Sequence, residues 1–429
     1  MGKSVLFKAK KAWLKIRLKG ENMHIGILKY AEQERYLGRI IASNTLVDAI
    51  QKYSSGHEIT LIAPEENLDK TVKKTLQENP LDVLFYPNPS LYRAMFFKTW
   101  NAKPLVVTGL THSLGHEPYL EWLHMNMLAG PSDGDAMICT SDCAIEAIRE
   151  MQTTIKSKHN NLPLLNLVQA PLGINCNSFY RSKGDDRKHI NLTYIGRLCP
   201  YTKVDLVPLL RMFKEILKKS TKPLMLNIAG EDSVGYKTYL GNKAKEFEIA
   251  NNVIISGNLP DEFKRNLLSR TDIFLAPSNG TQETFGLSIL EANASGVPVV
   301  AYDWSGYRSL IKNGKNGFLI ETTLHTDKYM LPPYQFDAIN QINFSSSVSV
   351  DEDKFISTVL CLIEENDLRA YMSDQAFRVA SEYDFEKVIP QYFKIWELLC
   401  SKNTQNNFRI STLDYYKIFS KYATHTLND

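Results

Sequence analysis

The stretch that decides the fold spans residues 272–303 and reads "DIFLAPSNGTQETFGLSILEANASGVPVVAYD". Its opening apolar run, closed by a proline, predicts a buried strand, and the run at 297–303 predicts another. Between them, the spacing of the apolar residues predicts a helix over about 285–295, with Gly296 and Pro298 as its stop signals. Strand, loop, helix and strand in this order form the repeating unit of a parallel sheet covered by helices.

The same alternation of apolar runs and helical stretches extends over most of the 429 residues. Because the runs are apolar throughout, they indicate parallel strands buried on both faces. A polar, glycine-containing stretch at 181–189 interrupts the series, which then starts again. We therefore predict an α/β protein with two consecutive doubly wound, Rossmann-like domains. The predicted strands are 23–29, 57–64, 81–87, 103–109 and 135–141 in the first domain, and 190–196, 224–230, 252–257, 272–277 and 297–303 in the second.

These patterns divide the chain into five parts. The parts are a basic amphipathic extension (1–22), a first Rossmann-like domain (23–183), a second (184–383), a helix that crosses back to the first domain (384–400) and a C-terminal tail (401–429). The stretch at about 326–350 interrupts the alternation of strands and helices in the second domain, and we interpret it as an insertion. The helix at 384–400 is expected to be interrupted or bent near Pro390.

Composition excludes several classes of protein. The net charge is only +3, which argues against a nucleic-acid-binding protein. The six cysteines form no C-x-x-C pair and the nine histidines do not cluster beside them, so neither a zinc site nor a disulfide framework is expected. Such cysteine usage fits a reducing cytoplasm. No apolar run reaches the roughly 18 residues that a membrane span needs.

The first 20 residues contain seven lysines and arginines and no acidic residue. On a helical wheel, their apolar residues share one face, with basic residues on both sides. This pattern is typical of an interfacial helix on anionic lipid, and it predicts peripheral attachment to the inner face of the membrane. Two alternatives remain open: a disordered basic leader, or an upstream extension of a chain whose natural start is Met23.

Two carboxylates flank the start of the helix predicted at 285–295. Glu283 lies in the loop at the carboxyl end of a strand, which is the ligand-binding edge of such a sheet. The unpaired amides of Phe285, Gly286 and Leu287 would attract a phosphate. Glu291, on the second turn, would accept hydrogen bonds from ribose hydroxyls, so the arrangement suits a nucleoside-diphosphate sugar. The structural alternative is that Glu283 complements the helix dipole and Glu291 lies on a solvated face.

The longer string "PSNGTQETFGLSILEANASGVPVVAYDWSGYRSLIKNGKNGFLI" resembles the signature of retaining glycosyltransferases of family four. Other segments, including "YIGRLCPYTKVDL", "LNIAGED" and "PLVVTGLTHSLG", follow in the order of the family, and the resemblance covers roughly residues 23–400. It implies the GT-B fold, in which two Rossmann-like domains face each other across a cleft. It also implies transfer of a hexose or related sugar from a nucleoside-diphosphate sugar to an acceptor hydroxyl, in glycan, polysaccharide or glycolipid synthesis.

The resemblance also implies roles for single residues. Glu283 would contact the donor sugar and Glu291 the ribose of the nucleotide. Arg197 and Lys203 would neutralise the diphosphate without a metal. His112, from the acceptor-side first domain, would approach the reacting sugar.

The same comparison leaves parts of the site undefined. By analogy, the backbone from Gly257 to Leu259 would face the base, but the base itself, uridine or guanosine, is not chosen. No cofactor or metal is expected. The loop after the first strand departs from the family, because it lacks the usual Gly-Gly pair and offers only Gly38. Acceptor identity and oligomeric state stay open.

The resemblance also implies a front-face transfer with retention, in which the departing phosphate oxygen takes the proton of the acceptor hydroxyl. The triplet Asp133-Gly134-Asp135 matches the Asp-x-Asp pattern of metal-binding glycosyltransferases. That motif ends a strand, whereas this triplet precedes one, so we interpret it as a turn. A dehydrogenase would need G-x-G-x-x-G after a first strand, which is absent. A sugar-nucleotide epimerase and a catalytically silent nucleotide-sugar-binding or scaffold subunit remain the alternatives.

Overall fold

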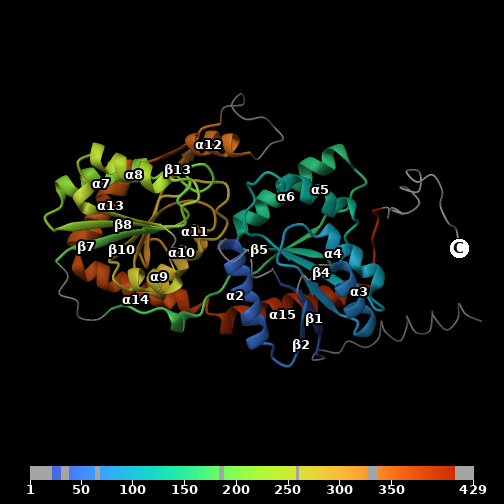
Figure 1. Cartoon of the computed structure of the whole chain (residues 1–429). Coiled ribbons are helices and arrows are strands. Elements are labelled where there is room, and N and C mark those ends of the chain that lie inside the picture. The colour runs from blue at the N-terminus through green and yellow to red at the C-terminus, as the bar shows by residue number, and fades with distance from the viewer. Residues whose placement is uncertain are drawn as a thin grey trace, which may run out of the picture.

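The computed structural model describes residues 22–29, 38–62, 68–182, 188–257, 260–326 and 337–410. Two α/β lobes lie side by side in Figure 1, and each is built on a six-stranded sheet. The prediction of two doubly wound α/β domains is therefore confirmed. The basic extension predicted over 1–22, apart from Asn22, lies outside the described residues, as does the tail beyond residue 410.

The first lobe is a parallel sheet with the strand order β2-β1-β3-β4-β5-β6. Strands β1, β3, β4 and β5 are buried along their whole length, as their apolar sequences require. The edge strand β6 is partly exposed and polar, which is why the apolar pattern did not predict it. The strands are β1 (His24–Leu28), β2 (Glu58–Ile62), β3 (Val83–Phe85), β4 (Val106–Leu110), β5 (Ala136–Cys139) and β6 (Asn166–Gln169), and the helices are α2 (Gly38–Lys52), α3 (Leu68–Glu78), α4 (Tyr92–Phe96), η2 (Phe97–Trp100), α5 (Tyr119–Leu128), α6 (Asp142–Lys158) and η3 (Cys176–Ser178).

The second lobe has the strand order β12-β11-β10-β7-β8-β9. Its chain starts in the middle of the sheet at β7, runs outward through β8 and β9, and returns to the other side of β7 at β10. The order therefore reverses between β7 and β10, and ligands of such sheets bind where this happens. The elements are β7 (Ile190–Ile195), α7 (Val207–Lys219), β8 (Leu224–Gly230), α8 (Tyr236–Glu246), η4 (Ala250–Asn252), β9 (Val253–Gly257), α9 (Asp261–Ser269), β10 (Ile273–Ala276), α10 (Leu287–Ala294), β11 (Val299–Tyr302), α11 (Tyr307–Leu310) and β12 (Gly317–Ile320).

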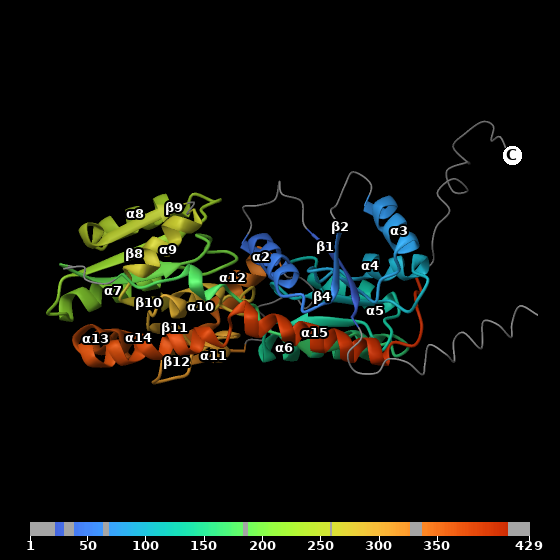
Figure 2. The same ribbon diagram turned by 90° about the horizontal axis from the view of Figure 1, so that it is seen from below.

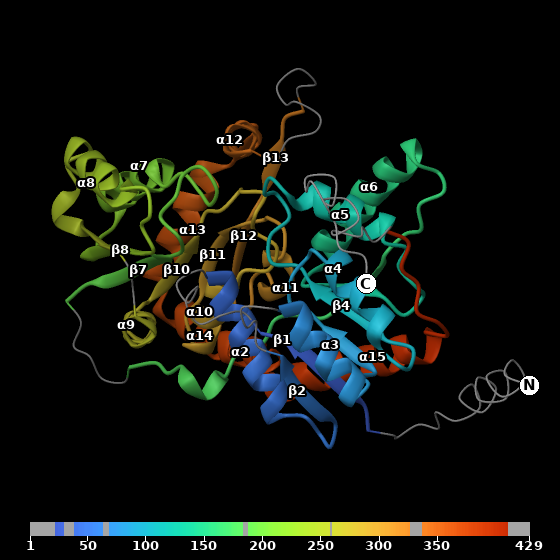
Figure 3. The same cartoon turned by 45° about the vertical axis from the view of Figure 1, so that its right-hand side comes forward.

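The stretch interpreted as an insertion contains regular structure. Strands β13 (Thr322–Leu324) and β14 (Val348–Val350) pair antiparallel and form its base. Helix α12 (Ala338–Ser346) lies between them in the chain, with Asp337 as its N-cap, whose side chain accepts a hydrogen bond from the amide of Asn340. Figures 1 and 3 show α12 at the top of the second lobe, on the side nearer the first lobe.

The chain ends its second lobe with α13 (Glu352–Glu364) and α14 (Asn366–Ser381) and then returns to the first lobe through α15 (Phe385–Lys402). Figure 2 shows α15 running from one lobe along the other. Trp396 is fully buried against the first sheet, where its indole donates to Thr108 Oγ1 at 3.0 Å. Of the two outcomes expected near Pro390, the interruption is wrong, because α15 continues through this residue, and the bend stays a prediction. The packing of the buried face of α15 against the first lobe compensates for the backbone hydrogen bond that proline removes.

The two lobes touch through the loop that precedes α10. Thr284 Oγ1 donates to the carbonyl of His112 at 3.0 Å, and Ser141 Oγ donates to the carbonyl of Thr284 at 2.7 Å. These partners follow β4 and β5, so the carboxyl edge of the first sheet meets the carboxyl edge of the second. Among the described residues, no helix is both long and apolar enough to span a membrane.

Candidate functional site

The reversal of strand order in the second lobe brings two loops together. Arg197 follows β7 and donates from Nη2 to Gln282 Oε1 at 3.0 Å. Lys203, farther along the same loop, donates from Nζ to Glu283 Oε2 at 2.5 Å. Residues separated by about eighty positions in the chain thus meet because the carboxyl ends of neighbouring parallel strands share one edge.

The Glu283 carboxylate is almost fully buried, with 9% of its side chain exposed. Besides Lys203, it accepts hydrogen bonds from the amide of Phe285 and the hydroxyl of Tyr307, each at 3.3 Å. Burial by itself would raise the pKa of this carboxyl, but the Lys203 ammonium and the hydrogen bonds outweigh burial and lower the pKa below its usual value. Glu283 is therefore a carboxylate held in its charged form.

The start of α10 differs in detail from the arrangement expected. The amide of Phe285 is not free for a ligand, because it donates to Glu283, and Phe285 and Gly286 are both buried. Leu287 and Ser288 are partly exposed and form the first turn, whose amides have no earlier helical carbonyl to bond. Of the three predicted residues, only Leu287 therefore lies in the accessible part of the helix terminus, together with Ser288.

Glu291 is buried inside α10, with 7% of its surface exposed, so the interpretation as a solvated face is wrong. Its carboxylate accepts a hydrogen bond from Lys264 Nζ of α9 at 2.6 Å. Burial would lower the pKa of Lys264, but the adjacent Glu291 raises it above its usual value. The sequence offered no signal for this pair, because its members are 27 positions apart on different helices.

His112 follows β4 and is half-buried in the first lobe. Its Nε2 lies 2.8 Å from Ser43 Oγ on α2 and 3.1 Å from the carbonyl of Pro87. With its proton on Nε2, the ring donates to that carbonyl. The backbone of His112 bonds to Thr284, the residue after Glu283, so the histidine is tied to the Glu283 loop across the lobe junction. Leu259, suggested for base binding, lies outside the described residues.

Two further side chains surround Glu283 that sequence reasoning did not single out. Tyr307 donates to it from the start of α11, and Tyr194 of β7 lies close enough to both Glu283 and Arg197 for their charges to act on its pKa. The Tyr194 hydroxyl is buried and, within the described part of the chain, has no hydrogen-bond partner. Burial raises the pKa of both tyrosines, so both hydroxyls stay protonated. Only the fold could reveal them, since an apolar strand pattern gives no sign of an inward hydroxyl.

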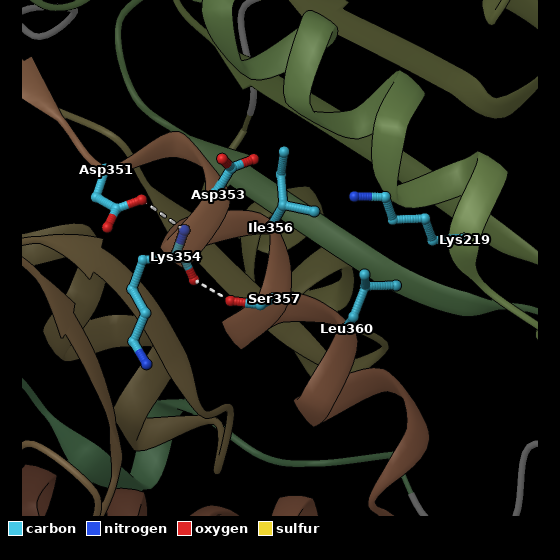
Figure 4. Close-up of a pocket in the computed structure, with 7 residues that line it drawn as sticks. All are labelled: Lys219, Asp351, Asp353, Lys354, Ile356, Ser357 and Leu360. Carbon is cyan, nitrogen blue, oxygen red and sulfur yellow. Dashed lines mark hydrogen bonds between the residues drawn. The ribbon is translucent and has the colours of Figure 1, made fainter.

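A cavity of about 230 Å³ opens between the lobes beside Phe285. It is lined by Phe285 and Pro171 and by side chains with polar groups from both lobes: Thr140, Gln169, Ser309, Tyr383 and Gln391. A larger groove of about 400 Å³ lies on the outside of the second lobe between α7 and α13, where Lys219 faces Asp353 and Ile356 (Figure 4). None of the predicted site residues lines this groove, so it is separate from the Glu283 cluster.

The Asp-x-Asp triplet of the first lobe is a structural turn. Asp135 is buried and accepts hydrogen bonds from Lys98 Nζ at 2.5 Å, the amide of Ser132 at 2.7 Å and the amide of Val107 at 2.9 Å. With both oxygens engaged, the carboxylate holds the start of β5 against β4. Among the described residues, no group of three or more potential metal ligands is close enough to hold an ion.

This buried pair gives a stability prediction. We expect Asp135→Asn to destabilise the protein by about 3–5 kcal/mol, because the Lys98 ammonium would remain buried without its counter-charge. Urea unfolding checks the value, and Asp135→Asn combined with Lys98→Met should recover part of the loss. The exposed pair Lys243 and Glu246 is the control, since Lys243→Met should leave unfolding unchanged. A single Asp135 variant as stable as the wild type would contradict this account.

The second lobe, which carries Arg197, Lys203, Glu283 and Glu291, is also the part with a family match. Residues 179–329 match the model of the glycosyl transferases group 1. All four residues lie inside the matched segment.

Curated relatives extend this similarity. The chain is 27% identical over 172 residues to the poly(glycerol-phosphate) alpha-glucosyltransferase of Bacillus subtilis, an overlap of 39% of this chain and 19% of that protein. It is 27% identical over 245 residues to the alpha-monoglucosyldiacylglycerol synthase of Streptococcus pneumoniae, an overlap of 51% of this chain and 52% of that protein. The chain thus spans from about a fifth to about half of the length of these two relatives.

Solved structures support the fold over a longer span. HepE from Anabaena, in complex with UDP and glucose, matches 88% of this chain and 100% of its own, with a TM-score of 0.59 at 16% sequence identity. The likeness covers both lobes and shows that they are arranged as in the GT-B fold.

Proposed function

We propose that the protein is a retaining glycosyltransferase that moves a hexose or related sugar from a nucleoside-diphosphate sugar to an acceptor hydroxyl. The observation that carries the proposal is the meeting of Arg197, Lys203 and Glu283 beside the N-terminus of α10, at the reversal of strand order. Two cations and a helix terminus at one sheet edge suit a diphosphate. A buried, charged Glu283 in the same cluster suits the hydroxyls of a sugar.

In this proposal, Arg197, Lys203 and the amides at Leu287 and Ser288 take up the charge of the departing nucleoside diphosphate. The glycosyl–phosphate bond breaks first, and the departing phosphate oxygen then accepts the proton of the acceptor hydroxyl. The acceptor oxygen bonds to the anomeric carbon on the same face, which retains the configuration. Lys203 must shift from Glu283 toward the phosphate, which leaves Glu283 free to accept from the sugar. Glu291 would exchange its bond to Lys264 for the ribose hydroxyls. No metal is needed for this charge balance.

A uridine nucleotide is the first donor to test, because HepE was solved with UDP and glucose. Guanosine donors remain the alternative. The acceptor class we favour is a glycan or a lipid-linked molecule, in line with the two curated relatives.

The decisive experiment offers purified protein a panel of UDP- and GDP-sugars with glycerol-phosphate polymer, diacylglycerol lipids and simple glycosides. Nucleotide release is measured first, and the products are identified by mass spectrometry, with NMR for the anomeric configuration. We expect release from one donor class and an axial-to-axial product. A protein that binds nucleotide but releases none with any acceptor would be a silent binding subunit, and an epimerised free sugar nucleotide would indicate an epimerase.

The basic residues 1–22 lead to a prediction on location. We propose that the protein works in the cytoplasm and attaches to the inner face of the membrane through this extension, whose apolar face and lysines suit anionic lipid. Deleting residues 1–22 should reduce co-sedimentation with phosphatidylglycerol vesicles at least tenfold, with no loss on phosphatidylcholine vesicles. Unchanged co-sedimentation after the deletion would remove the idea without touching the proposed activity.

A further inference from the structure

Helix α12 of the insertion packs on the loop that carries Glu283. Asn279 Nδ2 donates to the carbonyl of Ser345 at 2.9 Å, and the rings of Trp304 and Phe344 lie 6.2 Å apart. Trp304 in turn donates from its indole to the carbonyl of Gly280 at 3.0 Å. The loop is thus held from outside by a segment that the sheet itself does not require.

One side chain of this loop links α12 to the cationic part of the site. Gln282 accepts a hydrogen bond from Arg197 through Oε1, at 3.0 Å, and donates from Nε2 to Gln341 Oε1 of α12, at 2.8 Å. Gln341 is buried, with 7% of its surface exposed. Two consecutive hydrogen bonds therefore connect Arg197 in the site, through Gln282, to Gln341 in the insertion.

Only one orientation of the Gln282 amide satisfies both hydrogen bonds. An arginine side chain can only donate, so the oxygen of Gln282 must face Arg197 and its NH₂ group must face away. The acceptor oxygen of Gln341 stabilises that orientation of the amide. If the amide were free to flip, its NH₂ group would face the guanidinium and Arg197 would lose its acceptor.

We propose that Gln341 is a positioning residue, which orients Arg197 for the diphosphate of the donor by fixing the Gln282 amide. The inference rests on the proposed glycosyl transfer, because it is the diphosphate that Arg197 would meet. A positioned cation requires less side-chain ordering when charge develops on the leaving group. When this positioning is lost, kcat should therefore change more than the donor KM.

The test compares two replacements of Gln341 of similar length. Gln341→Met removes the acceptor and should lower kcat about tenfold while the donor KM changes less than twofold, the upper end of the range for one hydrogen bond between neutral groups. Gln341→Glu keeps an acceptor oxygen and should retain most of the wild-type kcat. Ile339→Ala, at a position on the same helix that is 68% exposed, is the control and should leave both constants unchanged.

A double-mutant cycle separates positioning from general packing. In an Arg197→Ala background, adding Gln341→Met should cause no further loss of kcat, because the group to be positioned is gone. An equal tenfold loss in that background, or a wild-type kcat for Gln341→Met alone, would overturn the inference. If Gln341→Met does not fold, Gln282→Met tests the same pair of hydrogen bonds from the loop. It should lower kcat about tenfold alone and cause no further loss in the Arg197→Ala background. A wild-type protein that releases nucleotide from no donor would instead overturn the proposed function, and this inference with it.

Discussion

Replacing Lys203 with methionine should lower turnover by about a hundred- to a thousandfold, the scale expected when one cationic donor is removed from a developing charge. The same change should destabilise the protein by about 3–5 kcal/mol, because the buried Glu283 carboxylate would lose its charged partner. Single-turnover nucleotide release and urea unfolding measure the two effects separately. A variant with wild-type turnover would contradict the role of Lys203 at the diphosphate.

The pH dependence of stability gives an independent check on this pair. In the wild type the pKa of Glu283 lies below its usual value, so the pair stabilises the fold above the unfolded pKa of about 4.3 and loses this contribution as the pH falls through the folded pKa. In Lys203→Met, burial dominates and should raise the pKa of Glu283. The deficit of the variant should therefore grow as the pH rises from the lowered folded pKa of the wild type to the raised folded pKa of the variant, and level off beyond it. A deficit independent of pH would contradict the charge-pair explanation.

A second variant separates folding from chemistry. Lys203→Met combined with Glu283→Gln removes both charges and keeps the shapes, so most of the lost stability should return. Turnover should stay at the low level of the single variant, because neither the cation for the diphosphate nor the carboxylate for the sugar is restored. Recovered turnover in the double variant would show that the single change acted only through misfolding.

Gly286→Ala should raise the donor KM at least tenfold and destabilise the protein by about 1–3 kcal/mol. Gly286 has a φ of +100°, in the region that favours glycine, and a Cβ there would lie 2.7 Å from the Tyr307 ring. Tyr307 donates to Glu283, so relieving the clash would move a partner of Glu283 as well as the start of α10.

The matched control for this change is Gly314→Ala. Gly314 also has a positive φ, of +76°, but no atom lies within 4 Å of its Cβ position. Gly314→Ala should therefore destabilise by strain alone, about 1 kcal/mol, and leave the donor KM unchanged. Calorimetry and donor titrations with both variants make the comparison. Equal KM values for the two would show that the start of α10 does not contact the donor.

The local patterns were sufficient for the buried central strands and for the helix at the site, but not for the polar edge strand β6 or for β13, α12 and β14. The apolar run at 272–277 corresponds to β10 (Ile273–Ala276), and the stop signals Gly296 and Pro298 match the end of α10 at Ala294. These features depend on periodicity and turn chemistry, which act between residues close in the chain. The placement of Glu283 and Glu291 on either side of a helix start follows from the same local rules.

Only the tertiary structure decided which side chains meet. The pairing of Lys264 with Glu291, and the contact of Gln282 with both Arg197 and Gln341, join segments on different elements. The physical reason is that a helix or strand is set by its own residues. The order of strands in a sheet and the seating of α12 on a loop depend instead on burying apolar surface against distant parts of the chain. That burial brings Arg197, Lys203 and Glu283 from distant parts of the chain into one charged cluster at a sheet edge.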